Sequence, residues 1–320
     1  MLSDEVTCVE TPQVTVGIPT RNCERTIGET LDSIINQDYP KDQLEVIVVD
    51  DGCTDQTIPL IHSKLEGSKL KIRVLHAGGK GLGTSRQMIV DNAHGKYIIW
   101  VDGDIILFPD FLAIQVDYME RNPRVWQARG RWEPHKAENL AEELENMTLI
   151  RYEARHSNKK HLAQKLVGIG GSICRREPLK SSGGFDATIF GAGEDIDISA
   201  RMMEKGWLMS FTKARFYHKS GTTWKVLWRR YFWYGYGSHY VKHKHQHLLQ
   251  VWTRTPPVAF FSGLLQAQKA YSVVHQKKSF LLPIQYLYKQ TAWCFGFVRG
   301  HLDGYGHMNK QNAKVGRKSK

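Results

Sequence analysis

Two aspartates stand directly behind a short apolar run. Asp102-Gly103-Asp104 follows residues 96–101, KYIIWV, which is typical of a buried strand. Ligands of open α/β sheets gather at the carboxyl ends of the strands. Carboxylate and phosphate oxygens are the ligands that Mg²⁺ or Mn²⁺ prefers, and such an ion offsets the charge of a departing phosphate. The acids therefore indicate a metal site beside a diphosphate, although D-G is also a common turn dipeptide.

A second acidic pair ends another strand-like run. Asp50-Asp51 follows residues 44–49, LEVIVV, and the neighbouring run 14–18 ends at Pro19-Thr20. A carboxylate at this edge of a sheet accepts hydrogen bonds from a uracil-type base or from a ribose. The alternative is an Asx turn that closes the strand.

The glycine-rich segment 78–86, GGKGLGTSR, is not a known phosphate loop. Thr84 stands where a P-loop has its lysine, and Arg86 replaces the third glycine of a dinucleotide fingerprint. The planar guanidinium of Arg86 suits either a diphosphate or an acid of the metal site.

Another acidic pair, Glu194-Asp195, opens a predicted helix over 195–205 that ends at Gly206. Free N–H groups at a helix start stabilise a carboxylate in its ionised form. Such a group can take the proton of a hydroxyl, or it can simply cap the helix.

These motifs occur together in one order and spacing. They are Pro19-Thr20-Arg21-Asn22, Val48-Val49-Asp50-Asp51-Gly52-Cys53-Thr54-Asp55, Val101-Asp102-Gly103-Asp104, Gly183-Gly184-Phe185-Asp186 and Gly193-Glu194-Asp195. In this arrangement the chain resembles the family 2 glycosyltransferases of the GT-A fold. The resemblance covers roughly residues 13–245.

The resemblance implies a role for each set of residues. The nucleotide would be bound by Pro19, Thr20, Arg21, Asp50, Asp51, Arg86 and Asp102. The metal would be bound by Asp104 and Asp102, with His218 as a third contact, although a lone histidine is more often a surface or packing residue. Asp195, beside Glu194, would be the base, which implies inversion, and the stretch 168–172 with Gly170 and Gly171 would border the acceptor.

A basic and aromatic segment follows at residues 224–236. Trp224, Arg229 and Arg230 are interpreted as a wall of the acceptor channel that also touches phosphate or lipid headgroups; the alternative is packing of an aromatic helix face onto the core. Histidines at 239, 243 and 247 recur every four residues, which indicates a solvated basic face rather than a metal site.

The elements that must position these residues follow from hydrophobic periodicity. Strands are predicted at 14–18, 44–49, 70–75, 96–101, 125–132 and 207–217, an extended segment at 166–175, and helices at 24–36, 57–65, 82–92, 111–120, 137–155 and 195–205. The alternation up to Asp104 predicts an α/β fold: a Rossmann-like GT-A domain whose mostly parallel sheet is flanked by helices. We expect a catalytic domain at 1–221 (nucleotide half 13–104, acceptor half 105–221), a helical extension at 222–308 with a boundary at 255–257, and a disordered tail at 309–320.

Charge is distributed unevenly along the chain. The net charge of +12 combines 25 Lys/Arg against 31 Asp/Glu in residues 1–212 with 19 against the single acid Asp303 in residues 213–320. Basic residues between tryptophans suit an anionic membrane surface. The apolar stretch 280–298 is interrupted by Pro283 and Lys289, so it is expected to lie on a membrane rather than span it.

The remaining composition favours the cytosol. The 5 cysteines are an odd number without a C-x-x-C pair, which indicates reduced thiols and no structural zinc. The first residues, MLSDE, show no signal peptide. We therefore expect a cytoplasmic protein that is peripheral to the cytosolic face of a membrane.

The sequence thus favours an inverting glycosyltransferase. It would move a sugar from a nucleoside diphosphate donor, with a UDP-sugar favoured, to a hydroxyl of a lipid-linked or polymeric glycan. A polyprenyl-phosphate glycosyltransferase is the nearest alternative, because a phosphate acceptor needs no base. A silent glycan-binding relative and a nucleic-acid-binding protein are more remote, since strand-end acids repel a phosphate backbone.

Overall fold

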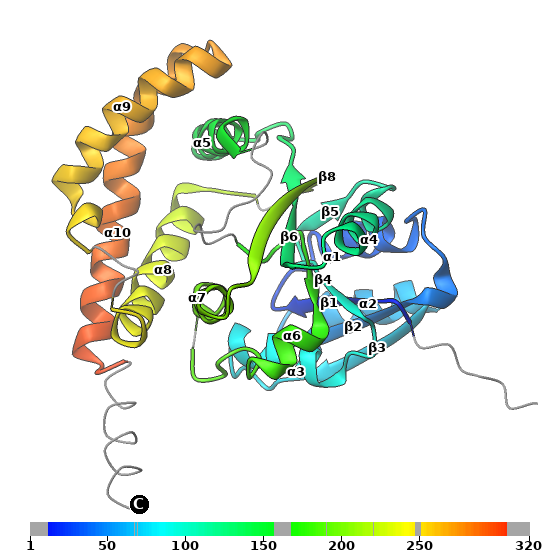
Figure 1. Cartoon of the computed structure of the whole chain (residues 1–320). Helices are drawn as coiled ribbons and strands as arrows, with labels where there is room; N and C mark the ends of the chain where they lie inside the picture. Colours follow the sequence, from blue (N-terminus) through cyan, green and yellow to red (C-terminus); the bar gives the residue numbers. More distant parts are fainter. Residues whose placement is uncertain are drawn as a thin grey trace, which may run out of the picture.

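The fold is a mixed sheet with helices on both faces and further helices at the C-terminal end (Figure 1). The computed structural model describes residues 12–66, 68, 70–156, 168–189, 191–219, 221–246 and 251–305. The strands are β1 (Val14–Thr20), β2 (Leu44–Asp50), β3 (Lys71–His76), β4 (Tyr97–Trp100), β5 (Ile105–Leu107), β6 (Val125–Trp132), β7 (Ser172–Arg175) and β8 (Leu208–His218). The helices are α1 (Ile27–Ile35), α2 (Thr57–Leu65), α3 (Leu82–Asn92), α4 (Phe111–Arg121), α5 (Leu140–His156), α6 (Arg176–Ser181), α7 (Glu194–Glu204), α8 (Trp224–Lys244), α9 (Pro256–Val274) and α10 (Leu282–Leu302).

The sheet has 8 strands in the order β3-β2-β1-β4-β7-β6-β8-β5. The first four are mutually parallel, β7 runs against both β4 and β6, and β5 runs against β8. The predicted fold class is therefore confirmed, with a sheet that is mixed but mostly parallel. Strand β5 and helix α6 were not predicted, because runs of three and six residues carry too little periodicity.

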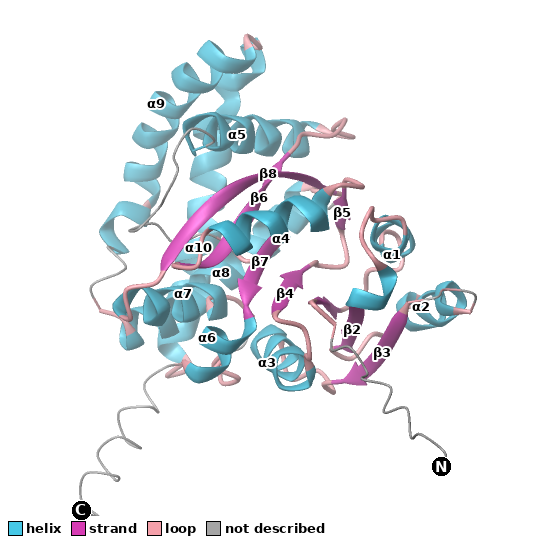
Figure 2. Cartoon of the chain, turned by 45° about the vertical axis from the view of Figure 1, so that its right-hand side comes forward, coloured by secondary structure: helices cyan, strands magenta, loops and turns pink. Residues whose placement is uncertain are grey.

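Both faces of the parallel half are buried, which explains its continuous apolar runs. Val46 and Val48 of β2 belong to the core that packs against α1, α2 and α4. Ile47 and Val49 alternate with them and belong to the core under α3, α6 and α7. Figure 2 shows these helices on the two sides of the sheet.

The C-terminal helices form a layer beyond the sheet. Helix α10 packs against both α8 and α9, and α9 also contacts α5, where Ala267 and Ala270 meet Leu144 and Met147. Within the described residues, no helix combines the length and the apolarity that a bilayer crossing needs. The predicted disordered tail at 309–320 lies outside the described residues.

Candidate functional site

A cleft of about 1020 Å³ opens at the carboxyl ends of β1, β2 and β4. Sequence-predicted residues that line it are Pro19, Thr20, Arg21, Asp51, Asp102, Asp104, Arg229 and Arg230. The cleft thus brings residues at the strand ends together with Arg229 and Arg230, because α8 forms the wall opposite the strand ends.

The nucleotide side of the cleft is fixed by backbone contacts. Asp51 Oδ1 accepts a hydrogen bond of 2.9 Å from the Gly81 N–H, and Arg21 Nη1 lies 3.6 Å from Asp51 Oδ2. Thr20 Oγ1 donates to the Val49 carbonyl at 3.0 Å. These contacts bring the glycine-rich segment beside the end of β1.

Asp50 points elsewhere, although it was predicted beside Asp51 in the nucleotide pocket. Its Oδ1 accepts from the Cys53 N–H at 2.7 Å, and its Oδ2 lies 3.1 Å from His76 Nδ1. Burial opposes ionisation, but these contacts lower the pKa of Asp50. Asp50 is therefore an ionised group that closes the turn after β2, and Asp51 is the member of the pair that lines the cleft.

Both acids of the Asp102-Gly103-Asp104 motif line the cleft, with about one third of each side chain exposed. His218 reaches this point because it is the last residue of β8 and pairs with Ile105. Its Nδ1 lies 4.0 Å from Asp104 Oδ1. Burial lowers the pKa of His218, against the opposing effect of Asp104 and Asp102. A neutral imidazole therefore offers a lone pair next to two carboxylates.

These donors suit a hard divalent cation, because Mg²⁺ is usually bound by one or two carboxylates that substrate phosphates complete. Among the described residues there is no group of three or more His, Cys, Asp and Glu side chains arranged to hold a metal by themselves. Asp102, Asp104 and His218 are the described side chains at this point of the fold that could contribute donors to such a cation.

Arg86 links the two acidic motifs beneath the cleft. Its guanidinium pairs with Glu194 and lies 3.2 Å from Asp102 Oδ1, while only 4% of the residue is exposed. Burial raises the pKa of Glu194 to about 7, with Arg86 acting against this rise and Asp195 adding to it. The sequence predicted either a diphosphate or an acid of the metal site as the partner of Arg86. The structure shows Arg86 paired with two acids.

Asp195 lies in the first turn of α7, next to Glu194. Its Oδ1 accepts from the Ile196 N–H at 2.8 Å, and the residue is half-buried. Burial raises the pKa of Asp195, with Arg86 lowering it and Asp102 raising it. A carboxylate with a raised pKa accepts a proton more readily than an exposed aspartate does.

The glycines predicted at the acceptor border lie directly behind these acids. A Cβ atom at Gly170 would stand 2.9 Å from Asp102 Oδ2, and one at Gly171 would meet the Phe216 ring at 2.5 Å. The chain can pass this close to Asp102 at Gly170 and to the Phe216 ring at Gly171 because both positions lack a side chain.

Helix α8 supplies one wall of the cleft. Arg229, Arg230, Trp233 and Tyr234 line it. Trp224 does not: its ring packs at 5.2 Å against Tyr288 of α10, as the packing alternative predicted for the aromatic face.

The solvated basic face predicted for the histidines of α8 is wrong for His239. This residue is 1% exposed, and its Nδ1 lies 2.6 Å from the Tyr305 carbonyl. His243 Nε2 lies 3.2 Å from His239 Nε2. Packing against α10 buries His239, although the sequence pattern is typical of a surface helix. His247 lies outside the described residues.

Sequence reasoning missed a polar group on the far wall of the cleft. His135, Glu138, Glu142 and Lys219 line the cleft, and His135 Nε2 lies 3.4 Å from the buried Glu142 Oε1. No sequence pattern predicts this group. His135 precedes α5, and Glu142 lies in α5, whose composition is typical of a surface helix.

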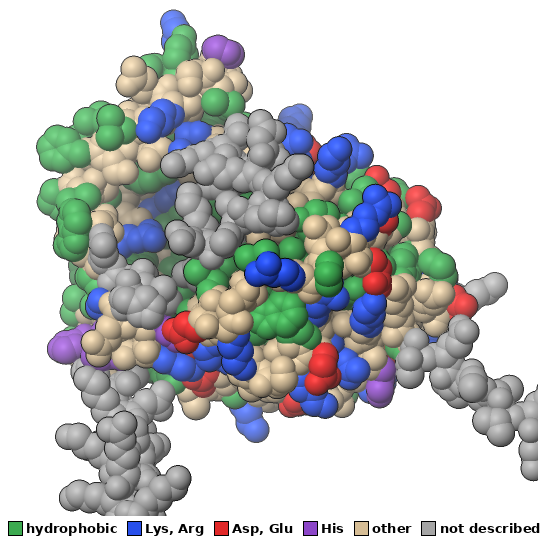
Figure 3. Space-filling view, viewed as in Figure 1, with side chains coloured by type: hydrophobic (Ala, Val, Ile, Leu, Met, Phe, Trp, Pro, Cys, Tyr) green, Lys and Arg blue, Asp and Glu red, His purple; other side chains and the backbone are tan. Residues whose placement is uncertain are grey.

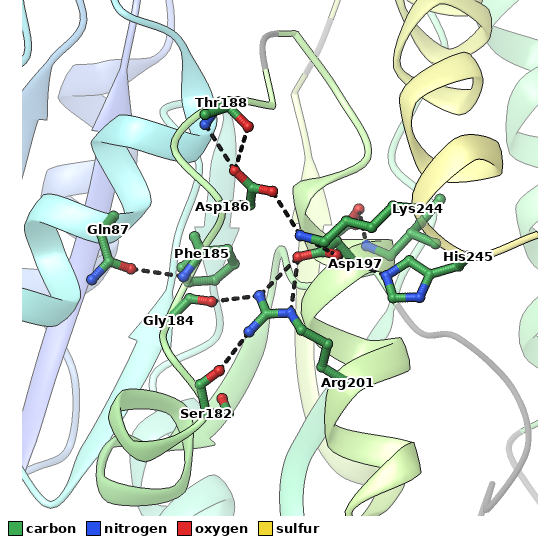
Figure 4. A network of polar contacts seen from close by, with 12 residues as sticks. Gln87, Ser182, Gly184, Phe185, Asp186, Thr188, Asp197, Arg201, Lys244 and His245 are labelled. Carbon is green, nitrogen blue, oxygen red and sulfur yellow. Dashed lines mark hydrogen bonds and ion pairs between the residues drawn. The ribbon is translucent and has the colours of Figure 1, made fainter. Parts of the chain in front are cut away.

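A polar network ties the cleft wall to the helix that carries Asp195 (Figure 4). Asp197 is fully buried and contacts Arg201 at 2.8 Å, Lys244 at 2.8 Å and His245 at 2.8 Å. Lys244 also contacts Asp186 at 2.6 Å. The C-terminal end of α8 is thereby held against α7 and the loop before it.

The fold is that of the GT-A glycosyltransferases. The model of the family described as Glycosyl transferase family 2 matches residues 15–182, and the chain belongs to this family. The solved mannosyltransferase PcManGT from Pyrobaculum calidifontis, in complex with GDP-Man and Mn²⁺, has a similar fold, with a TM-score of 0.61, 19% identity, and coverage of 92% of this chain and 88% of that one.

Curated relatives carry glycosyltransferase names. The probable glycosyltransferase YdaM of Bacillus subtilis is 27% identical over 241 residues, which is 72% of this chain and 56% of YdaM. The poly(ribitol-phosphate) beta-N-acetylglucosaminyltransferase TarS of Staphylococcus aureus is 38% identical over 87 residues, which is 27% of this chain and 15% of TarS. This chain therefore spans about half of one relative and a small part of the other.

Proposed function

We propose that the protein is an inverting glycosyltransferase that moves a sugar from a nucleoside diphosphate donor to a hydroxyl of a lipid-linked or polymeric glycan. The observation that carries the proposal is the position of Arg86. Its guanidinium contacts both Asp102 at the end of β4 and Glu194 at the start of α7. Arg86 thereby joins an acid that lines the cleft to the acid that directly precedes Asp195 in the chain.

The donor would lie along the strand ends. Pro19, Thr20, Arg21 and Asp51 would contact the nucleoside, and a UDP-sugar is favoured because a carboxylate accepts hydrogen bonds from a uracil imide. Asp102, Asp104 and the neutral His218 would hold Mg²⁺ or Mn²⁺. When bound, such an ion neutralises charge on the departing diphosphate. The Mn²⁺ named with PcManGT, whose fold is similar, supports this cofactor.

Transfer would be a single displacement. The acceptor oxygen attacks the anomeric carbon while the bond from that carbon to the diphosphate oxygen breaks. The hydroxyl proton passes to the Asp195 carboxylate, whose raised pKa suits this task. The nucleoside diphosphate leaves from the other face of the sugar, so the anomeric configuration inverts.

A donor screen tests this proposal. The purified protein is incubated with UDP-, GDP- and dTDP-sugars, with Mn²⁺ or with EDTA, and free nucleotide is measured. We expect nucleotide release from one class of donor, lost in EDTA and absent from an Asp104→Asn variant. Release from no donor in the presence of metal would contradict the proposal. Mass analysis of lipid extracts after incubation then identifies the acceptor.

A polyprenyl-phosphate acceptor is the second candidate. The two arginines on the α8 wall, Arg229 and Arg230, favour an anionic acceptor. An ionised phosphate needs no base, so an Asp195→Asn variant with full activity would favour this candidate, and a dead variant would favour a hydroxyl acceptor.

For the setting, we propose a cytoplasmic protein peripheral to the cytosolic face of a membrane. The support is the excess of 19 Lys/Arg over one acid in residues 213–320. We also propose that residues 1–221 form the catalytic domain and residues 222–308 the membrane-associated extension. TarS, by its name, acts on a poly(ribitol-phosphate) polymer, which supports a glycan-polymer acceptor as one option.

A further inference from the structure

Helix α9 buries its small residues and exposes its large ones. Ala259, Gly263, Ala267 and Ala270 are buried, at a spacing that forms one helix face. The solvent-facing positions include Phe260 (37% exposed), Phe261 (67%), Leu264 (48%) and Leu265 (60%). This is the reverse of the pattern expected for a helix whose outer face meets water.

Helix α10 shows a partial reversal, since it buries Leu282 and Trp293 but also polar residues. Its buried side includes the polar residues Gln285, Lys289 and Gln290. Its exposed side carries Ile284 (59% exposed), Phe295 (60%), Val298 (54%) and Leu302 (74%). Most of the exposed large hydrophobic side chains in the described residues lie between 251 and 305. Such a contiguous apolar surface indicates an interaction site.

The inner sides of α9 and α10 are closely packed, so the exposed apolar residues do not belong to an incompletely packed core. A Cβ atom at Gly296 would stand 1.9 Å from the Phe232 carbonyl oxygen, and one at Gly263 would stand 2.6 Å from the Pro283 Cα. Lys289 lies 2.8 Å from Glu145 Oε2 of α5. Close packing through small residues, with large apolar residues outside, is typical of helices that meet lipid.

The charges beside the apolar surface are mostly positive. Arg254, Lys269 and Lys277 are exposed, α9 and α10 contain no acidic residue, and Asp303, which follows α10, pairs with Arg299 at 3.0 Å. Figure 3 shows hydrophobic side chains gathered along the margin that α9 forms, with Lys and Arg beside them. A second copy of the chain would bring two basic surfaces together, whereas an anionic bilayer would neutralise this one.

We infer that the α9–α10 hairpin is the element that enters the headgroup layer of an anionic bilayer, with Phe260, Phe261, Leu264 and Leu265 inserted. The inference rests on the proposed peripheral location and specifies the surface that produces it. Because α10 packs against α8, the wall of the cleft that carries Arg229 and Arg230 would lie close to the lipid surface. A lipid-linked acceptor would then reach the cleft without leaving the membrane.

Vesicle flotation tests this inference. The full chain is floated with vesicles of phosphatidylcholine alone or with about one third phosphatidylglycerol. We expect the wild type to float with the anionic vesicles, and a Phe261→Glu/Leu265→Glu variant to lose at least about tenfold in partitioning, because two inserted apolar side chains become charged. Leu60→Glu on α2, at a position 38% exposed, is the matched control and should float as the wild type does.

Two results would overturn the inference. One is equal flotation of the double variant and the wild type. The other is a wild type that ignores vesicles and is a dimer by light scattering, with the double variant monomeric. Metal-dependent nucleotide release, measured without vesicles, separates this inference from the proposed function. If the wild type and the double variant both release nucleotide and float equally, only the inferred role of the α9–α10 hairpin is refuted. If the wild type releases no nucleotide, the enzyme proposal is refuted.

Discussion

Strand β2 and helix α9 place their apolar residues in opposite ways. Ile47 and Val48 of β2 are fully buried, whereas Phe261 and Leu265 of α9 are 67% and 60% exposed. Both segments are strongly apolar in sequence, so composition alone does not separate them. The strand lies between two layers of helices, and the helix lies at the margin of the molecule (Figure 1).

This difference is the one expected if the sheet half faces water and the α9–α10 hairpin faces lipid, as inferred above. The sheet half buries large side chains, as a protein in water does, and supports a cleft of fixed polar groups. The buried faces of the α9–α10 hairpin carry alanine, glycine and polar side chains together with Leu282 and Trp293, and many of its large apolar side chains are exposed. We therefore expect changes in the two regions to affect different measurements.

The largest effect should come from Asp195→Asn in the first turn of α7. Removal of the base should reduce turnover by about 10³-fold, because a positioned base contributes 10²–10⁴-fold. The dissociation constant of UDP should be unchanged, since Asp195 is not placed at the nucleotide. Steady-state nucleotide release and calorimetric UDP binding provide the two measurements, and unaltered turnover would refute the role of Asp195.

Arg86→Met should be the most destabilising change in the sheet half. It leaves Glu194 and Asp102 without their buried cation, and loss of one partner of a buried pair costs about 3–5 kcal/mol. Urea unfolding measures the loss. The matched control is Arg121→Met, since Arg121 pairs with Asp117 on the surface with a side chain 75% exposed, and should stay within about 0.5 kcal/mol.

The comparison between strand and helix can be tested with one pair of truncations. Ile47→Ala should cost about 3 kcal/mol of unfolding free energy, because it removes fully buried methylene groups. Leu264→Ala in α9 should cost less than about 0.5 kcal/mol, because the side chain is 48% exposed. Equal losses would show that the outer face of α9 is covered in solution.

Asp197→Asn, where α7 meets the end of α8, should have a smaller effect. Contacts with His245, Lys244 and Arg201 hold the pKa of Asp197 well below its usual range, although burial opposes this. A lowered carboxylate pKa stabilises the fold above the unfolded value of about 3.9, and that stability is lost as pH falls further. We expect a loss of about 2 kcal/mol at pH 7 that shrinks between pH 5 and pH 3. A difference that is constant with pH would contradict this.

Features that depend on neighbouring residues in the chain were predicted from the sequence. Helices α2 and α3 and strand β6 begin and end where periodicity predicted, and the strand-end acids Asp51, Asp102 and Asp104 lie in one cleft. Contacts between residues far apart in the chain could not be predicted from the sequence. Arg86 and Glu194 are 108 residues apart, so only the fold could choose between an acid and a diphosphate for the guanidinium. The burial of His239 depends in the same way on α10, which no helical period in α8 reveals.

The anomeric configuration of the first product tests the account most directly. The wild-type protein is incubated with an α-linked nucleotide-sugar and metal in D₂O, and proton NMR follows the released or transferred sugar before it equilibrates. A single displacement with Asp195 as base predicts a β-configured product. An α-configured first product would require a different arrangement of acids and would contradict the mechanism proposed for this cleft.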